Sequence, residues 1–487
     1  MNKLTRIVTT VMLAMVVVNN YAQTRYTMED VLQMAKSQSP FSKQAETRKE
    51  NRYWQYKFYK SDYNPQLRLS GNLPNYNQDY FQNVTDDGKV EFQSRERTDA
   101  IVNLGLQQPI FFTGGTLSVN TNLNKINDFY YDYSTWNGTI VNVRLDQPIL
   151  NFNELRWNKM TEPLRFEESK RSYVEEMEFI SQQAVDRFFT VLDAQINLQI
   201  AQFNLANNDT IYKIEQGRYN IGTTPKDKLL QAELQLLRSR QDVTSARINL
   251  QNSKLDLRSY IGLKNDDEFE LVLPEEIPTL NVTVDEALQR AKDNRADFIA
   301  FERRKIEADR EVAEARGQRF QINLSASYGL NNSGDELDAI YTDPLSQQRI
   351  NVGFNIPVLD WGRNRARMRT ALANQKLNDY VIAQDEIIFE QEIVTNVAQF
   401  EVLLSQIEIT KKSDEVAQER YLVSQNRYLI GKIDITNLNI ALNEKDAAKR
   451  SYVGALRSFW SSYYGLRRLT LYDFSRNQLL YTPEQKN

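Results

Sequence analysis

The chain has 487 residues with a formal net charge of −4, and it contains no cysteine and no histidine. These absences exclude disulfides, thiol nucleophiles, histidine acid/base catalysis and most transition-metal sites, and no basic run suggests nucleic acid. Only 17 glycines and 12 prolines interrupt the chain, and no arrangement of the remaining reactive side chains suggests catalysis. We therefore expect one elongated body that is not an enzyme and has no cofactor or metal site.

The first 22 residues are expected to be a cleaved signal peptide. Lys3 and Arg6 precede an apolar run over 7–18, and Ala22 supplies the small residue before the cut. The run is too short for the roughly 20 residues of a membrane-spanning helix. No later run is apolar enough to span a membrane as a helix, so any crossing has to use strands.

Alternating apolar and polar residues predict six strands. They lie near 66–73, 99–109, 116–124, 139–148, 321–331 and 349–357, four in the first half of the chain and two in the second. Most have about the 9 to 11 residues that cross a bilayer as a tilted strand. One face is aliphatic and the other is rich in Asn, Gln, Ser and Arg, as expected for lipid outside and water inside.

One face of a soluble sandwich is the alternative interpretation, and the aromatic residues at both strand ends favour the membrane. They are Phe129, Tyr130, Tyr131, Tyr133 and Trp136 at one end, and Phe111, Phe112, Phe152, Trp157 and Trp361 at the other. Six strands cannot close alone, since the smallest membrane barrels have about 8. Several protomers must therefore share one barrel, and three would give about 18 strands, an admissible number.

Two of these strands lead directly into very long helices. The strand before Pro148 precedes a helical stretch over 153–219, and the strand before Pro357 precedes one over 361–429, with Asp360 as a candidate N-cap. Each helix would be about 100 Å long. Each turns at an Ile-Gly pair and is expected to return to about Tyr260 or Tyr463.

Two adjacent apolar stripes run along the first long helix. They are Met177, Ala184, Val191, Leu198 and Leu205, and one position over Val185, Phe189, Leu192, Ile196, Phe203 and Ala206. Two stripes predict a neighbour on each side, so a wall of helices fits better than a two-stranded coiled coil.

Four short motifs recur in the same order in both halves. T-M-E-D at Thr27 matches T-V-D-E at Thr283, Q-L-R-L-S at Gln66 matches Q-I-N-L-S at Gln321, R-Y-N-I-G at Arg218 matches R-Y-L-I-G at Arg427, and S-Y-I-G-L-K at Ser259 matches S-Y-Y-G-L-R at Ser462. The order indicates a duplicated unit. The offset falls from 255 residues at Gln66 to 209 at Pro148, so the first half carries extra residues that we interpret as an inserted β-hairpin.

The duplication predicts the organisation of the chain. After the signal peptide at 1–22, a first repeat covers 23–264 and a second covers 283–466. An equatorial connector at 265–282 and a C-terminal equatorial segment at 467–487 complete the chain. Short strands are predicted in these two segments, at Glu268–Pro274 and Leu469–Phe474, and are expected to form a belt around the helices.

Together these features resemble the TolC-type outer-membrane efflux proteins, over essentially the whole mature length. The duplicated unit, the Q-P-I and I-P-V strand ends leading into D-W-G-R, and the two R-Y-x-I-G motifs carry the resemblance. It implies an α+β membrane protein, a homotrimer whose transmembrane β-barrel in the outer membrane continues as a long periplasmic α-helical barrel. The implied function is a passive exit duct of a tripartite efflux or type I secretion system, with a periplasmic adaptor and an inner-membrane pump of the RND or ABC type as partners.

The four-strand first half departs from the two-plus-two arrangement of the family's best-known member. The extra hairpin either spans the membrane, which gives 18 strands in a trimer, or forms a flap outside it, which gives 12. We favour the first. The sequence does not name the cargo.

The resemblance also places candidate tip residues, for gating or adaptor contact, at the two helical turns. Arg218, Tyr219 and Asp227 on one turn, and Tyr428 and Lys432 on the other, stand where the family's hydrogen bonds and ion pairs hold the entrance shut. Thr436 and Asn439 fall near the acidic constriction of the best-known member, so no cation-selecting aspartate ring is expected here. The whole set is Arg218, Tyr219, Ile221, Gly222, Asp227, Arg427, Tyr428, Ile430, Gly431, Lys432, Thr436 and Asn439. A solvated residue at a helix end remains the alternative for each.

Two other functions compete with the duct. A free-standing diffusion porin in the outer membrane would explain the strands but not two helices of about 100 Å. A secreted coiled-coil adhesive protein would explain the helices but not six alternating strands.

Overall fold

The computed structural model describes residues 24–264, 268–278, 280 and 282–481. The predicted signal peptide lies outside these residues. Two compact units make up the chain: a helical unit of residues 1–48, 171–295 and 389–487, and a sheet unit of residues 49–170 and 296–388. Among the described residues, no helix is both long and apolar enough to cross a membrane.

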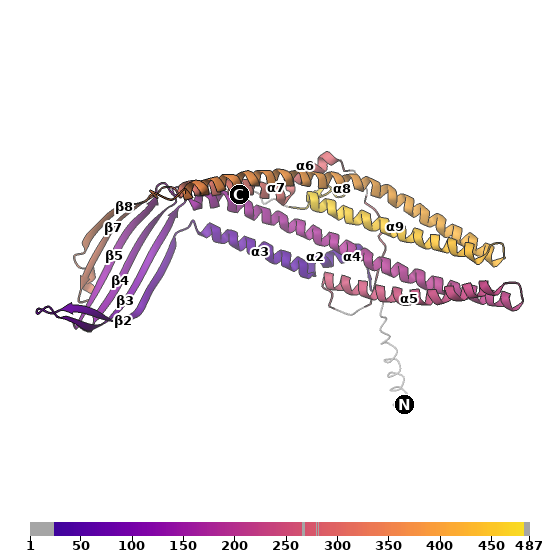
Figure 1. Ribbon diagram of the computed structural model, residues 1–487, viewed down its shortest axis with the longest axis horizontal. Helices are drawn as coiled ribbons and strands as arrows, with labels where there is room; N and C mark the ends of the chain where they lie inside the picture. Colours follow the sequence, from indigo (N-terminus) through magenta and orange to yellow (C-terminus); the bar gives the residue numbers. More distant parts are fainter. Residues whose placement is uncertain (1–23, 265–267, 279, 281, 482–487) are drawn as a thin grey trace, which may run out of the picture. The chain divides into compact units, whose positions relative to one another are not determined.

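The sheet unit contains a six-stranded antiparallel sheet in the order β2-β3-β4-β5-β7-β8 (Figure 1). Its strands are β2 (Gln66–Val84), β3 (Val90–Ile110), β4 (Gly115–Asp128), β5 (Tyr133–Pro148), β7 (Gln321–Gly334) and β8 (Leu345–Asn355). The short 3-10 helix η1 (Asp338–Tyr341) lies between β7 and β8. The prediction of four strands in the first half and two in the second is confirmed.

The strand register gives the sheet one aliphatic and one polar face. Residues directly opposite each other share a face, and one such row crosses the sheet through Leu67, Leu106, Val119, Val143, Tyr328 and Gln348. The neighbouring row on the other face is Arg68, Gly105, Asn120, Asn142, Gly329 and Gln347. The sequence pattern predicted this separation.

The predicted strand lengths are wrong for the first two strands. β2 has 19 residues and β3 has 21, so their hairpin continues well beyond the aliphatic rows. In this extension Tyr76 pairs with Thr98 and Gln78 with Glu96. The sequence of this extension lacks the regular apolar-polar alternation by which a strand is recognised.

The helices confirm the duplication, because they occur in four pairs of equal length. The pairs are α2 (Met28–Gln38) and α6 (Val284–Asn294) with 11 residues, α3 (Pro40–Ser61) and α7 (Ala296–Gly317) with 22, α4 (Glu154–Asn220) and α8 (Arg363–Leu429) with 67, and α5 (Lys226–Ile261) and α9 (Ile435–Thr470) with 36. Only the strands between them differ in number.

Local capping explains where several helices begin. The hydroxyl of Thr27 accepts from the backbone N–H of Asp30, whose carboxylate accepts from the N–H of Thr27, a reciprocal capping box. The Thr283 hydroxyl caps α6 by accepting from the backbone N–H of Glu286 at 3.3 Å, without the reciprocal bond. Before α8, the Asp360 carboxylate accepts from the backbone N–H groups of Gly362 and Asn364, both at 3.0 Å.

The core of the helical unit lies among α2, α4, α5, α8 and α9. Phe188, Phe189, Leu257 and Phe459 are fully buried there, and Val191 and Leu192 from the predicted stripes join them. The connector contributes β6 (Phe269–Leu271), which pairs in parallel with β1 (Thr24–Tyr26), a strand that the sequence did not reveal. Phe269 of β6 is part of the same core.

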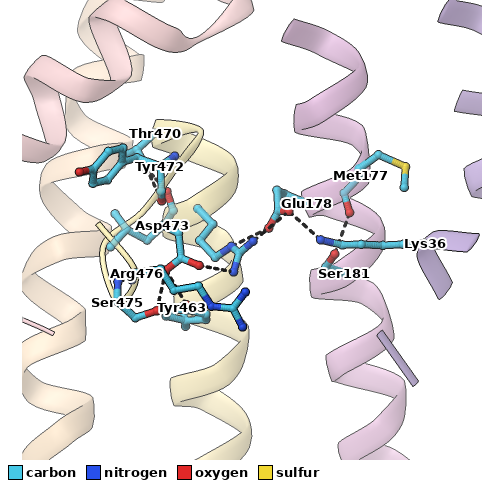
Figure 2. A network of polar contacts seen from close by, with 12 residues as sticks. Lys36, Met177, Glu178, Ser181, Tyr463, Thr470, Tyr472, Asp473, Ser475 and Arg476 are labelled. Atoms are coloured by element: carbon cyan, nitrogen blue, oxygen red, sulfur yellow. Dashed lines mark hydrogen bonds and ion pairs between the residues drawn. The ribbon is translucent and has the colours of Figure 1, made fainter. Parts of the chain in front are cut away.

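A polar network with buried carboxylates connects the segment that follows α9 to this core (Figure 2). Arg467 of α9 contacts Glu178 of α4 through Nε at 2.8 Å and Asp473 through Nη1 at 2.9 Å. Lys36 of α2 reaches the same glutamate at 2.8 Å. Asp473 belongs to β9 (Tyr472–Asp473), which pairs with β10 (Gln478–Leu479), so one arginine joins α4, α9 and the final hairpin.

The predicted end of the last helix is wrong. The matching S-Y-x-G-L motifs behave differently, because Gly262 adopts a left-handed conformation and caps α5, whereas Gly465 stays inside α9. Leu466 and Leu469 continue the buried face of α9, which ends at Thr470 instead of near Tyr463. The predicted strand Leu469–Phe474 is accordingly reduced to Tyr472–Asp473.

Gly262 is expected to tolerate alanine worse than Gly222. Both have positive φ angles, 75° and 81°, so alanine at either costs about 1–2 kcal/mol in backbone conformation. At Gly262 the new Cβ would also stand 2.7 Å from the carbonyl oxygen of Gln38, whereas nothing lies within 4 Å at Gly222. We expect a further loss of about 1–3 kcal/mol from Gly262→Ala. Chemical unfolding of both variants measures the difference, and equal losses would contradict it.

Candidate functional site

The candidate site is formed by the ends of the two helical hairpins of the helical unit. The turn between α4 and α5 places Gly222 at φ 81°, with Thr223 N–H donating to Arg218 C=O at 2.9 Å. The turn between α8 and α9 repeats this geometry, with Gly431 at φ 74° and Lys432 N–H donating to Arg427 C=O at 2.9 Å. Glycine suits the left-handed position that closes each helix.

The returning helices begin differently. Pro225 occupies the N-cap of α5 and supplies no side-chain cap. Asp434 caps α9 by accepting from Asn437 N–H at 2.9 Å.

Glu215 joins the two hairpins. Its Oε1 atom accepts from the Tyr428 hydroxyl at 2.6 Å and pairs with Arg218 Nη1 at 2.9 Å. Arg218 also donates to the backbone carbonyl of Tyr428 at 3.4 Å and stands 5.1 Å from the centre of its ring. One carboxylate thus links α4 to α8 within a protomer.

The Glu215 link is buried. Tyr428 is 1 % exposed and Glu215 is 4 % exposed. Burial raises the pKa of Tyr428, and the hydrogen bond to Glu215 together with the charge of that carboxylate raises it further, while Arg218 opposes the shift. Tyr428 therefore stays protonated at neutral pH and donates its proton to the carboxylate.

A second layer of contacts lies farther from the turns. The Tyr421 hydroxyl donates to Asn207 at 3.2 Å, and burial raises the pKa of Tyr421 to about 12. Asn204 donates to Asp446 of α9 at 2.7 Å. Lys445 lies 4.1 Å from the Phe203 ring centre and 4.8 Å from that of Tyr421. These contacts also join α4 of the first hairpin to α8 and α9 of the second.

An apolar cluster fills the space around these contacts. Its buried members are Ile211, Ala232, Tyr421, Tyr428, Ile435, Leu438 and Leu442, drawn from all four helices. The hairpins are therefore held together by packing as well as by polar bonds. The polar bonds add specificity to this packing, because they require particular side chains to meet.

The structure brings together only two of the predicted tip residues, Arg218 and Tyr428. Gly222 and Gly431 form the turns, and Asn439 is half-buried. The remaining residues are exposed: Tyr219, Ile221, Asp227, Arg427, Ile430, Lys432 and Thr436. Within the part of the chain that the structure describes, the side chains of Tyr219, Asp227 and Lys432 make no hydrogen bond or ion pair, so the predicted role of these three in closure remains a prediction.

Glu215 is the site residue that sequence reasoning missed. The signal was available, since Glu215 precedes Arg218 by three positions and such residues face each other on a helix. The motif comparison hid it, because the position 209 residues later is Ser424. The match between the repeats therefore did not include Glu215, the residue that both Arg218 and Tyr428 contact.

A family model covers both helical hairpins. The family model described as outer membrane efflux protein matches residues 116–263 and 287–470. The chain belongs to the outer membrane efflux protein family. It is an outer-membrane channel with a transmembrane barrel and a periplasmic extension, a transport protein and not an enzyme, as the sequence predicted. Channels of this family are trimers, so this efflux protein contributes one third of its channel.

Solved structures share the fold of this efflux protein at low sequence identity. The CmeC outer membrane channel of Campylobacter jejuni has 15% identity and a TM-score of 0.65, covering 93% of this chain and 87% of that chain. VceC of Vibrio cholerae has 15% identity and a TM-score of 0.64, covering 91% and 95%. MtrE of Neisseria gonorrhoeae has 14% identity and a TM-score of 0.60, covering 92% and 90%. No curated protein sequence matches the chain.

Proposed function

We propose that this efflux protein is the passive exit duct of a tripartite machine, whose periplasmic end is closed by the Glu215 link until a partner opens it. The observation that carries the proposal is the buried carboxylate that joins α4 to α8 through Arg218 and Tyr428. Burial of a charge is unfavourable unless it is paired, so separating α4 from α8 would deprive the buried Glu215 carboxylate of its hydrogen bond from Tyr428 and thereby oppose opening.

The ends of the hairpins also carry the surface that a periplasmic adaptor would contact. Ile221 is 75 % exposed and Ile430 is 67 % exposed, one at each turn. Near the α8–α9 turn, a groove of about 620 Å³ is lined by Val416, Val423 and Ile433 together with charged residues. Exposed apolar side chains bordered by charges are typical of protein interaction sites. An inner-membrane pump of the RND or ABC type would supply the energy, since the chain itself performs no chemistry.

We propose that opening separates the hairpins as the returning helices α5 and α9 swing outward. Tethering the turns should then block export. Because the chain has no cysteine, Ile221→Cys and Ile430→Cys can be joined selectively with a bismaleimide that contains a reducible spacer. In cells that depend on this channel, cross-linking should abolish export and reduction should restore it, with each single variant as a control. Continued export by the tethered double variant would overturn the proposed opening.

A free-standing porin is the alternative, and conductance separates the two. A closed duct should conduct weakly in a planar bilayer without its partners, because the link within each protomer stays intact. A porin should conduct strongly alone. High conductance of the purified wild-type trimer would favour the porin.

A further inference from the structure

We infer that β2 of each protomer pairs with β8 of the next, so that the trimer closes a barrel of 18 strands, six from each chain. The inference rests on the trimeric outer-membrane duct proposed above and specifies how wide its membrane pore is. The alternative is a barrel of 12 strands, in which β2 and β3 lie outside the wall.

β2 and β8 are the two edges of the sheet in the described part of the chain. Each edge presents a row of unpaired backbone N–H and C=O groups. Such groups cannot remain unpaired in lipid, which has no water to satisfy them. The six strands of one chain are also too few to close by themselves. The edges therefore need partners from other protomers.

The two edges fit each other in direction. Every neighbouring pair in the sheet is antiparallel, so β2 and β8, with four strands between them, run in opposite directions. β8 of one protomer placed beside β2 of the next continues the antiparallel ladder without interruption. Three such contacts close a ring, because each is a head-to-tail interface.

The edges also fit each other by face. On β2 the aliphatic face presents Leu67 and Leu69, which are 66 % and 73 % exposed. On β8 the same face presents Ile350, Val352 and Phe354, all exposed. Because a shift of one residue would turn either strand over, pairing in the matching register continues one lipid-facing band around the ring.

The β3–β4 ladder argues that the first two strands belong to the wall. It runs without a register break from Arg97 opposite Asp128 to Ile110 opposite Gly115. Val102 and Leu106 of β3 share the aliphatic face with Leu123 and Val119 of β4. A 12-stranded barrel would break this ladder and leave its aliphatic side chains in water. The family match begins at Thr116 in β4, so β2 and β3 lie outside the matched residues.

The strand number sets the width of the pore. With strands about 4.8 Å apart and tilted by about 40°, 18 strands enclose a backbone diameter of about 36 Å, against about 24 Å for 12. The cross-section is then about twice as large. The membrane section of this duct would therefore admit cargo too bulky for a 12-stranded pore.

Cysteine cross-linking tests the seam in the chain's cysteine-free background. Asn351→Cys on β8 is combined in turn with Arg68→Cys, Ser70→Cys or Asn72→Cys on β2, all on the polar face. Oxidation of intact cells should give covalent dimers and trimers with at least one pair. The matched control set combines Asn351→Cys with Ser118→Cys, Asn120→Cys or Asn122→Cys on β4. In a 12-stranded barrel β4 of the next protomer would be the neighbour of β8, so in an 18-stranded barrel this set should give monomers only.

Cross-links with the β4 set would overturn the inference. If neither set links, electron cryo-microscopy of the wild-type trimer decides, since 18 strands support the inference and 12 contradict it. A trimer with 12 strands that still exports would refute the wide barrel while leaving the proposed duct intact. A particle that is not trimeric, or that conducts as an open porin, would refute the duct itself.

Discussion

Replacing Arg467 with methionine is expected to lower the free energy of unfolding by about 3–5 kcal/mol, because it leaves buried carboxylates without their main partner. The Glu178 and Asp473 side chains are 4% and 2% exposed, and Arg467 contacts both. Methionine preserves most of the side-chain volume, so the loss reports the missing charge and hydrogen bonds. Chemical unfolding of the purified protein, followed by intrinsic fluorescence, measures it.

The adjacent arginine is the matched control for this variant. Arg468 pairs with Glu392 at 3.2 Å, but these side chains are 31% and 44% exposed. Ion pairs that reach water contribute about 0–1 kcal/mol, so Arg468→Met should have a small effect. If both variants lowered the free energy of unfolding equally, burial of the Glu178–Arg467–Asp473 network would not be what determines how much that network stabilises the fold.

The pH dependence of stability gives this experiment a second readout. Burial alone would raise the pKa of Asp473, but the hydrogen bond from Ser475 and the charge of Arg467 hold that pKa below its ordinary value of 3.8. Because the pKa of Asp473 is lower in the folded state, its ionised carboxylate stabilises the fold above pH 3.8. This contribution to the free energy of unfolding is lost as the pH falls through the folded-state pKa. Arg467→Met should weaken this acid-dependent loss, whereas Arg468→Met should leave it unchanged.

Much of the fold could be predicted because its signals are local. A proline ends each strand before a long helix, and an Ile-Gly pair marks each hairpin turn. The predicted helices over 153–219 and 361–429 differ from α4 and α8 by at most two residues at either end. Apolar residues repeat along them with helical spacing, and glycine alone adopts the left-handed conformation at the turns without strain.

The errors occurred where tertiary contacts decide the outcome. Gly262 and Gly465 stand in matching motifs, yet only the first ends a helix, because the residues after Gly465 pack into the core. The parallel pairing of β1 with β6 joins segments far apart in the chain, and three-residue strands carry too little pattern to be recognised. The extension of the β2–β3 hairpin was missed because its sequence lacks a regular apolar-polar alternation.

The candidate site was predicted only in part, because the motif is the same in both halves while the contacts of its side chains are not. The R-Y pair occurs in both halves, but Arg218 from the first copy and Tyr428 from the second meet at Glu215. Their counterparts, Arg427 and Tyr219, are exposed. A comparison of the repeats treats the two R-Y motifs as equivalent. In the contact between them, however, the first motif uses its arginine and the second its tyrosine.

This asymmetry provides a matched pair of variants for the proposed gate. Tyr428→Phe is expected to open the channel, whereas Tyr219→Phe is not. Both substitutions remove one hydroxyl from the same motif. Only Tyr428 donates to a buried carboxylate, at 2.6 Å, and a hydrogen bond to a charged group contributes about 1.5–3 kcal/mol. Its loss should shift the closed-to-open equilibrium of each protomer by about ten- to a hundredfold. Single-channel recording in planar bilayers should show higher conductance for Tyr428→Phe alone.

The result also locates the closing contact. Glu215→Gln should reproduce the leak of Tyr428→Phe, because the neutral amide attracts Arg218 less and accepts a weaker hydrogen bond from the hydroxyl. Combining the two changes should add little to either, since both remove the same bond and neighbours in one network are not additive. An equal leak from Tyr219→Phe and Tyr428→Phe would refute a gate held within each chain by Glu215. Because Tyr219 is exposed in the single chain, that result would place the closing contact between protomers.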